Sequence, residues 1–244
     1  MENEKVLLVT GASSDVGLAL IRKIGGNYKK IWAHYHGSKE GIAQLQKTFG
    51  EVIVPIQADF SSEESTDAMI GTIENSGDLP DHVVHLSAPK ARNLQFHKTS
   101  WADYQRELDT SLRSVTKILQ AFLPKMAKKK QGKVVFMLTA YTLGVPPKFQ
   151  SIYVTSKYAL LGLMKSLSAE YAGKGITVNG VSPEMMETKF LSDLPELIIE
   201  QNAQSSPLGR NLSVEDVVPA FEYLLSDAAD AVTGQNLGIT GGMR

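Results

Sequence analysis

The amino-acid sequence predicts an α/β fold in which one doubly wound, parallel sheet of about seven strands carries helices on both faces. Short apolar runs alternate with longer stretches of helical periodicity from one end of the chain to the other, which is typical of such sheets. A glycine-containing turn, Thr10 to Gly17, joins the first apolar run to the first helix. No linker of domain-boundary composition and no internal repeat interrupts the pattern, so we expect one domain over residues 1–244.

Seven short segments are predicted to be strands. The first is wholly apolar, which suits a strand that is buried on both faces of a parallel sheet. The third contains Pro55, and proline is poorly tolerated in a central strand. In chain order the predicted strands are 6–9, 31–35, 52–56, 83–86, 134–138, 176–181 and 236–239.

Helices are predicted between these strands, with right-handed crossovers. They cover 18–24, a stretch that begins near Lys39, 61–77, 100–128, 150–171 and 213–225. The last of them begins behind an apparent capping box formed by Ser213 and Asp216. The helical signal in 185–204 is weak, and apolar side chains such as Phe190 favour a mobile substrate lid over about 184–206.

A crevice is expected where the strands end. In a doubly wound sheet the ligand binds beyond the carboxyl ends of the strands, at the switch in strand order. The turn at 10–17, the segment at 85–88 and the loop at 139–144 each follow a predicted strand. We therefore expect all three to line one crevice, with Tyr153 at the start of the helix that follows the last of them.

Composition excludes several classes of function. The formal net charge is -1, so no global field attracts nucleic acid or an anionic membrane, and we expect neither as a partner. The absence of cysteine excludes disulfides, zinc–thiolate sites and thiol nucleophiles, and we expect no metal. The first five residues have no signal-peptide pattern, and no apolar run approaches the roughly 18 residues that span a bilayer. The expected location is the cytoplasm.

Tyr153 and Lys157 form the most informative pair. Residues four apart lie above one another on the same face of a helix. An ammonium group close to a phenol favours the phenolate, so we expect Lys157 to lower the pKa of Tyr153. Such a phenol can give a proton to a developing alkoxide or take one from an alcohol. The spacing alone also occurs by chance in many helices.

The turn after the first strand is a candidate phosphate site. Gly11 and Gly17 are spaced for a tight turn that brings a helix N-terminus close to a pyrophosphate. Asp15 stands where a middle glycine would be expected, and a carboxylate beside a diphosphate is unfavourable unless it points away. An ordinary turn between strand and helix is the alternative interpretation.

The end of the second strand indicates which nucleotide binds. NAD enzymes usually carry an acid there for the ribose 2′-hydroxyl, whereas His36, Ser38 and Lys39 could receive a 2′-phosphate. NADP(H) is therefore the preferred cofactor and NAD(H) the alternative. Asp59, at the end of the third strand, either accepts a hydrogen bond from the adenine amino group or serves as a turn residue.

The sequence resembles the short-chain dehydrogenase/reductase family over essentially its whole length, and its branch of 3-oxoacyl-acyl-carrier-protein reductases in particular. The resemblance implies a Rossmann-type fold, a nicotinamide cofactor and a substrate carbonyl or alcohol. The residues that carry it, in their order and spacing, are Thr10, Gly11, Gly17, Asp59, Tyr153, Lys157, Asn179, Pro183, Thr188, Thr233, Gly234, Gln235, Gly241 and Gly242.

The resemblance implies a role for each catalytic candidate. Tyr153 would be the general acid/base, and Lys157 would bind the nicotinamide ribose. Thr139, where the family usually has serine, would hold the substrate carbonyl; Tyr141 and Thr142 are the alternatives. Ser111 aligns with the family's asparagine that supports a proton relay through water. The implied cofactor contacts are Gly11, Ser13, Ser14, Asp15, Val16, Gly17, His36, Ser38, Asp59, Phe60, Ser87, Ala88, Tyr153, Lys157, Pro183 and Thr188.

Several positions depart from the family pattern. The family's Asn-Asn-Ala-Gly after the fourth strand appears as His85-Leu86-Ser87-Ala88, and its Pro-Gly after the sixth as Pro183-Glu184. Together with Asp15, Ser111 and Thr139, these changes favour either an altered substrate or a loss of activity.

Two functional hypotheses follow. The first is an NADPH-dependent oxidoreductase that reduces a carbonyl to an alcohol by hydride transfer, with a small-molecule or carrier-bound substrate such as a 3-oxoacyl thioester or another apolar ketone. The second is a catalytically weakened nucleotide-binding sensor or scaffold. Sugar epimerases and dehydratases are a third possibility, but such relatives normally carry an added C-terminal substrate domain.

Broad apolar faces on the helices 100–128 and 150–171 favour a homodimer or a homotetramer.

Overall fold

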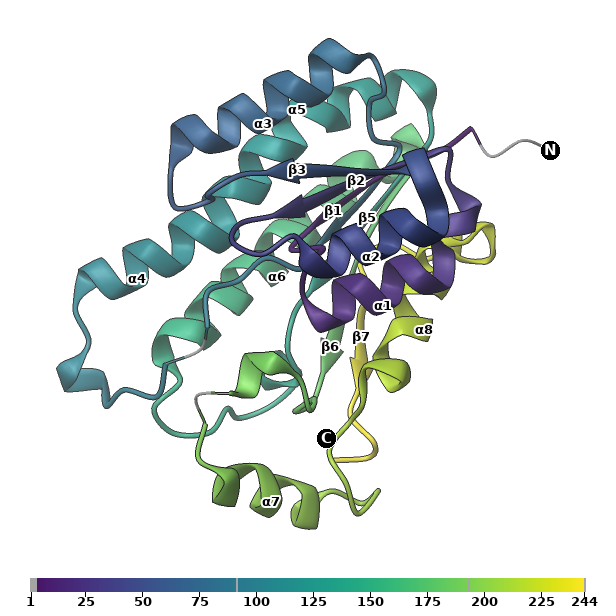
Figure 1. The fold of residues 1–244 in the computed structure, drawn as a ribbon. Helices are drawn as coiled ribbons and strands as arrows, with labels where there is room; N and C mark the ends of the chain where they lie inside the picture. Colours follow the sequence, from purple (N-terminus) through teal and green to yellow (C-terminus); the bar gives the residue numbers. More distant parts are fainter. Residues whose placement is uncertain (1–3, 91, 193, 244) are drawn as a thin grey trace.

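The computed structural model describes residues 4–90, 92–192 and 194–243. Its centre is a seven-stranded parallel sheet in the order β3-β2-β1-β4-β5-β6-β7, which confirms the predicted fold class (Figure 1). The strands are β1 (Val6–Thr10), β2 (Lys30–Tyr35), β3 (Ile53–Gln57), β4 (His82–His85), β5 (Gly132–Met137), β6 (Ile176–Pro183) and β7 (Asn236–Ile239).

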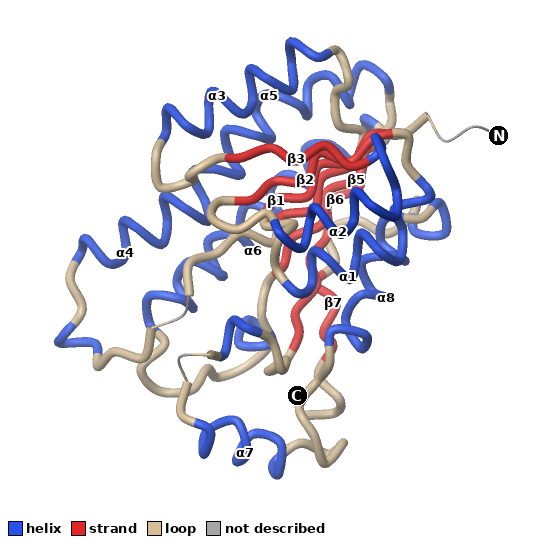
Figure 2. Tube along the Cα trace, viewed as in Figure 1, coloured by secondary structure: helices blue, strands red, loops and turns tan. Residues whose placement is uncertain are grey.

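Helices cover both faces of the sheet (Figure 2). One face carries α1, α2 and α8, and the other carries α3, α5 and α6, with α4 packed on α6. Their bounds are α1 (Asp15–Ile24), α2 (Glu40–Phe49), α3 (Glu63–Ser76), α4 (Trp101–Leu108), α5 (Ser114–Lys129), α6 (Ser151–Tyr171), α7 (Glu196–Ser205) and α8 (Val214–Leu225). The capping box of Ser213 and Asp216 is confirmed at the start of α8.

Burial explains why the central strands are almost purely apolar. Successive side chains of a strand point to opposite faces, and both faces of this sheet are covered, so every residue of β1 is buried. Leu8 contributes to the core under α3, α5 and α6, whereas Leu7 contributes to the core under α1, α2 and α8. Pro55 is accommodated because β3 is the edge strand, where a missing N–H costs no ladder hydrogen bond.

The long helix expected over 100–128 is interrupted. A π-turn, η4 (Asp109–Arg113), separates α4 from α5 and places the buried Ser111 at its centre. Periodicity alone did not predict this change in winding. In the region 185–204, where the signal is weak, α7 forms beyond the carboxyl end of β6 (Figure 1).

Strand order reverses between β1 and β4. The chain moves outward from β1 to β3 and then returns to β4 on the other side of β1, so the carboxyl ends of β1 and β4 form a topological switch point. Within the described part of the chain, none of the helices combines the length and the apolar character that crossing a bilayer requires.

Candidate active site

A cavity of about 360 Å³ lies at the carboxyl ends of the central strands. Its wall is formed by the start of α1, the segment after β4, the loop after β5, the first turns of α6 and the segment after β6. The expected convergence of these segments on one crevice is therefore confirmed. The predicted site residues in its wall are Ser13, Ser14, Asp15, Val16, Ala88, Thr139, Tyr153, Lys157, Pro183 and Thr188.

Close packing explains why glycine occupies position 11, in the turn before α1, and position 17, in the first turn of the helix. Gly11 has a φ of +69°, and a Cβ there would lie 3.1 Å from the Ser87 backbone nitrogen. A Cβ on Gly17 would lie 2.7 Å from the Cα atom of Ala12. Ser14 caps the helix, because its Oγ accepts a 3.1 Å hydrogen bond from the Gly17 N–H. The turn thus brings the N-terminus of α1 to the edge of the cavity.

Asp15 contacts the segment that follows β6. Its Oδ2 accepts a 2.8 Å hydrogen bond from the backbone N–H of Lys189. The carboxylate therefore has a hydrogen-bond partner outside the helix, although Asp15 remains in the cavity wall. The same contact ties the segment 184–206 to the start of α1.

Tyr153 and Lys157 face the same cavity, and the Lys157 Nζ lies 5.5 Å from the centroid of the Tyr153 ring. Lys157 is buried, and its ammonium donates a 2.9 Å hydrogen bond to the Met137 carbonyl. Burial disfavours the charged form and lowers the pKa of Lys157 to about 8, although Glu107 opposes the shift. The two side chains are thus held together by consecutive turns of α6.

The pKa of Tyr153 shifts in the direction opposite to the one that the sequence predicted. Burial raises its pKa above the usual value, a hydrogen bond with Thr139 opposes the rise, and the charges of Tyr141 and Glu107 add to it. Lys157 does not lower the pKa here, because its ammonium points to the Met137 carbonyl while desolvation of the phenol dominates. The free protein therefore keeps Tyr153 protonated.

Of the three hydroxyl candidates after β5, Thr139 and Tyr141 line the cavity. The Thr142 hydroxyl instead belongs to a buried network: it donates to the Thr139 carbonyl at 2.8 Å and accepts from the Asn236 amide at 3.0 Å. Ser182 completes that network. Thr142 thus holds the loop in place, which leaves Thr139 and Tyr141 as candidates.

Ser111 is buried beneath the site and not in the cavity wall. Its carbonyl accepts a 2.9 Å hydrogen bond from His85 Nε2, and the Nδ1 of the same ring accepts from Thr10 Oγ1 at 2.8 Å. These partners assign the proton to Nε2. Burial lowers the pKa of His85 to about 3, so the imidazole is neutral. The Ser111 hydroxyl donates to Glu107 Oε1 over 3.4 Å.

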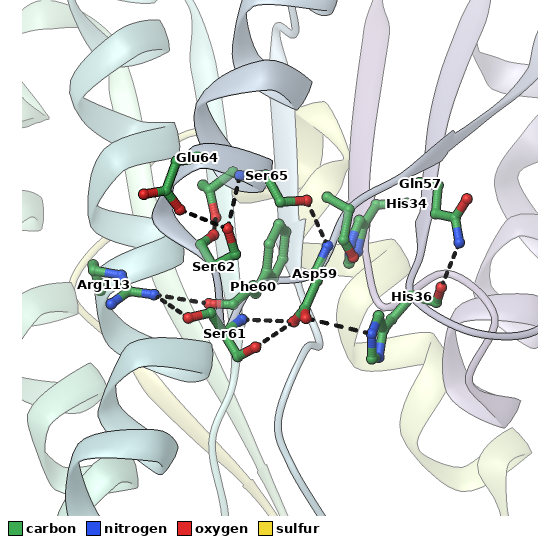
Figure 3. A network of polar contacts seen from close by, with 12 residues as sticks. His34, His36, Gln57, Asp59, Phe60, Ser61, Ser62, Glu64, Ser65 and Arg113 are labelled. Carbon is green, nitrogen blue, oxygen red and sulfur yellow. Dashed lines mark hydrogen bonds and ion pairs between the residues drawn. The ribbon is translucent and has the colours of Figure 1, made fainter.

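The predicted adenosine end lies outside this cavity. Figure 3 shows Asp59 between Ser61 and His36 in a network of polar contacts. Asp59 Oδ1 accepts from the N–H and the hydroxyl of Ser61 at 2.8 and 2.7 Å, which lowers the pKa of Asp59. Its Oδ2 lies 3.8 Å from His36 Nε2. His36 and Ser38 are exposed, whereas the Phe60 ring is buried and stacks on His34 at 4.0 Å. The Phe60 side chain is thus unavailable to a ligand.

Three features fit a dinucleotide. The N-terminus of α1 offers backbone N–H groups, and Gly11 leaves room for close approach of the backbone. Ser87 Oγ is buried without a hydrogen-bond partner among the described residues, next to that turn. The same cavity reaches Tyr153 and Lys157. A ligand that spans from the helix start to these side chains would satisfy the donors that face it.

Sequence reasoning missed one prominent group, Glu107. It is an acidic residue 6% exposed, on α4, one turn before Ser111. A signal was available, because Glu107 shares the helical face of Ser111, which the sequence had already assigned to the site. The segment after β6 was also missed in part, since Lys189 supplies the partner of Asp15.

Comparisons with known proteins agree with this geometry. A family model described as enoyl-(acyl carrier protein) reductase matches residues 11–244. The 3-oxoacyl-[acyl-carrier-protein] reductase FabG of Staphylococcus aureus is 29% identical over 100% of this chain and 99% of its own length. Nodulation protein G of Azospirillum brasilense is 30% identical over 99% of this chain and 98% of its own length.

The fold is shared with solved structures. The crystal structure of a 3-oxoacyl-[acyl-carrier protein] reductase from Brucella melitensis has a TM-score of 0.85, covers 99% of this chain and 91% of its own, and is 22% identical. The family model extends over nearly the whole chain, and the catalytic candidates Tyr153 and Lys157 lie within the match. The protein therefore belongs to the short-chain dehydrogenase/reductase family, the enzymes that interconvert CH–OH and C=O groups with NAD(P).

Proposed function

We propose that this enzyme is an NADPH-dependent carbonyl reductase in which Tyr153 protonates the substrate oxygen. The observation that carries the proposal is the shared cavity of the α1 start, Tyr153 and Lys157, with the lysine Nζ 5.5 Å from the tyrosine ring centroid. The alternative of a non-catalytic nucleotide-binding scaffold finds no support in the relatives, two of which are named as reductases.

Each residue of the site has a separate role in the proposed reaction. A bound nicotinamide nucleotide supplies the hydride. The Thr139 hydroxyl holds the carbonyl oxygen and orients it towards the Tyr153 phenol, whose raised pKa keeps it protonated and ready to donate. Lys157 does not lower the pKa of Tyr153 in the free protein, but it carries a positive charge into the same site, and in this proposal that charge stabilises the phenolate once proton transfer has formed it. Pro183, Thr188 and the lid at 184–206 exclude water from the cavity.

The choice of NADPH rests on the end of β2. His36 and Ser38 are exposed there, and His36 Nε2 lies 3.8 Å from an Asp59 carboxylate oxygen, so the imidazole ring and the Ser38 hydroxyl are both accessible to a 2′-phosphate. Replacing both, as His36→Ala with Ser38→Ala, should weaken NADPH binding about tenfold and leave NADH binding within twofold. Fluorescence titration of both nucleotides measures this, and equal losses for the two would refute the preference.

The substrate class follows from the cavity lining. Apolar side chains dominate one wall, and a groove of about 940 Å³ adjoins the cavity and shares Met185, Leu194 and Tyr141 with it. An acyl chain or a hydrophobic ring fits this surface. The relatives from Staphylococcus aureus and Brucella melitensis are named for 3-oxoacyl groups on acyl-carrier protein. We therefore place 3-oxoacyl thioesters first among candidate substrates, free or carrier-bound, and other apolar ketones second.

A matched pair of tyrosine variants tests the function. Tyr153→Phe removes the proposed acid, whereas Tyr158→Phe removes an exposed hydroxyl from the same helix. With NADPH and a panel of 3-oxoacyl thioesters, quinones and ketones, Tyr153→Phe should lower kcat by about 10²- to 10⁴-fold, and Tyr158→Phe should match the wild type. Undiminished turnover in Tyr153→Phe would remove the mechanism.

A cytoplasmic location and a homodimer or homotetramer remain predictions from sequence. The exposed rings of Phe96, shortly before α4, and Trp101, at its start, support self-association, because the two residues are 74% and 71% exposed in the single chain. Trp101→Glu should lower the mass that light scattering measures in solution if this surface joins subunits.

A further inference from the structure

Glu107 is a buried carboxyl group that packing does not require. The residue is 6% exposed and lies on the inner face of α4. Among the described residues, its side-chain hydrogen bond is the 3.4 Å contact in which Ser111 Oγ donates to Glu107 Oε1. Burial of an ionisable group is costly without strong partners, and an apolar side chain would fill the same space at no such cost.

The backbone around Glu107 is shaped for Ser111. The π-turn Asp109–Arg113 follows α4 directly, and such turns occur frequently at functional sites. His85 Nε2 donates to the Ser111 carbonyl at 2.9 Å, so this carbonyl already has a protein donor. The hydroxyl of Ser111 turns instead to Glu107. Ser111, which aligns with the family's asparagine that supports a proton relay, is thereby connected to the Glu107 carboxyl group.

The charges around Glu107 belong to the active site. Lys157 and Tyr153 interact electrostatically with it from α6, which packs against α4, and the neutral ring of His85 contacts the neighbouring Ser111 carbonyl from the end of β4. Burial raises the pKa of Glu107 to about 7, while Lys157 and Ser111 oppose the rise. Glu107 in turn raises the pKa of Lys157 against the effect of burial. A group that titrates near neutral pH can both release and accept protons.

We propose that Glu107 supplies protons to Lys157 and Tyr153, as a positioning residue that acts through Lys157 and does not itself touch the substrate. The proposal rests on the proposed function, in which Tyr153 is the acid. Among the described residues no ion pair joins Glu107 to Lys157, although the two charges interact, and the proposal therefore includes one water that bridges the two groups.

Protons balance along this path during reduction. The Tyr153 O–H bond breaks, and its proton binds the substrate oxygen as the hydride of the nicotinamide nucleotide reaches the carbonyl carbon. The phenolate takes a proton from the Lys157 ammonium, and the lysine amine takes one from the Glu107 carboxylic acid. Solvent water then protonates the Glu107 carboxylate. Each turnover consumes one hydride from the nucleotide and one proton from solvent.

The first test measures the carboxyl group itself in the nucleotide-free protein. Infrared spectra of the wild type should show a carboxylic acid band that disappears as the pH rises through about 7. The band should be absent from Glu107→Gln and retained in Asp109→Asn, which removes an acid of the next turn that pairs with Arg113 at 2.8 Å. A wild type without such a titrating band would overturn the proposal.

The second test measures turnover. Glu107→Gln should lower kcat for reduction about tenfold with the KM for NADPH unchanged, and should raise the solvent deuterium isotope effect, because proton supply becomes slow. Asp109→Asn should behave as the wild type. Glu107→Asp, which keeps a carboxyl group, should recover part of the loss. If Glu107→Gln does not fold, Glu107→Met, which fills the same space without a carboxyl group, replaces it in both tests.

The outcomes separate the two proposals. If Glu107→Gln turns over at the wild-type rate with an unchanged isotope effect while Tyr153→Phe is inactive, the role of Glu107 is refuted and the proposed function stands. If Tyr153→Phe is active as well, the proposed function fails and the role of Glu107 fails with it.

Discussion

The Lys189 backbone N–H donates a 2.8 Å hydrogen bond to the carboxylate of Asp15, across 174 positions of sequence. This contact joins the first turn of α1 to the short helix that begins at Lys189, and both residues line the cavity. In the sequence, Asp15 is an unfavourable replacement for a glycine. In the fold it connects the start of α1 to the segment that follows β6.

Removal of this carboxylate should loosen the segment after β6. A hydrogen bond to a charged group contributes about 1.5 kcal/mol at the low end of its range, which suits an exposed contact. In Asp15→Ala the Lys189 amide should therefore exchange its hydrogen about tenfold faster, whereas Asp15→Asn, which keeps an acceptor oxygen, should change it less. Hydrogen exchange measured at single amides checks this, and equal rates in all three proteins would contradict it.

Because of Lys157, the free energy of unfolding should change with pH in the alkaline range. Its pKa is about 8 in the folded protein and about 10.5 when unperturbed, so between these values the unfolded chain binds more protons. The free energy of unfolding contributed by this group therefore rises as the pH increases from about 8 to about 10.5, by on the order of 3 kcal/mol. Below pH 8 the cost of burying the ammonium is fully present.

Comparison with Lys157→Met isolates that contribution from every other titrating group. Urea unfolding at several pH values should show the wild type gaining stability relative to Lys157→Met across this window. Parallel curves for the two proteins would mean that the pKa of Lys157 is not lowered by folding.

Thr139 and Thr142, in the loop after β5, should respond differently to loss of their hydroxyl groups. Thr139→Val should lower kcat by about tenfold or more, because the carbonyl loses a donor, while Thr139→Ser should stay close to the wild type. Thr142→Val should instead reduce stability by about 1–3 kcal/mol, since Asn236 and Ser182 lose a buried partner. Steady-state kinetics and thermal unfolding of the three variants measure the two effects, and a kinetic defect confined to Thr142→Val would reverse the assignment.

Replacing each of two glycines by alanine should change the stability of the protein in opposite directions. A Cβ on Gly17 would lie 2.7 Å from the Ala12 backbone, so Gly17→Ala should destabilise the protein by about 2 kcal/mol or more. Gly71 lies within α3 with open space around its Cα, and Gly71→Ala should stabilise by about 0.5–1 kcal/mol. Denaturant unfolding of both variants is the check; a neutral Gly17→Ala would show that the turn can relax.

Much of the fold could be predicted because its signals are local. Short strand-like segments, most of them apolar, predicted all seven strands, and their alternation with helices predicted a parallel sheet. The Tyr153 and Lys157 spacing needed only helix geometry to place both side chains on one face. Pro55 was doubtful in the sequence because strand order was unknown, and the edge position of β3 resolves it.

The remaining features depend on contacts between distant segments. The direction of the Tyr153 pKa reflects how deeply the folded protein buries the phenol and where the Lys157 ammonium points, neither of which is encoded in a four-residue spacing. The π-turn at Ser111 and the burial of Glu107 arise where α4 packs on α6. Short-range pattern therefore determined the elements and the pairing of Tyr153 with Lys157 on one helical face, whereas tertiary packing decided the electrostatics, because desolvation and charge act through space.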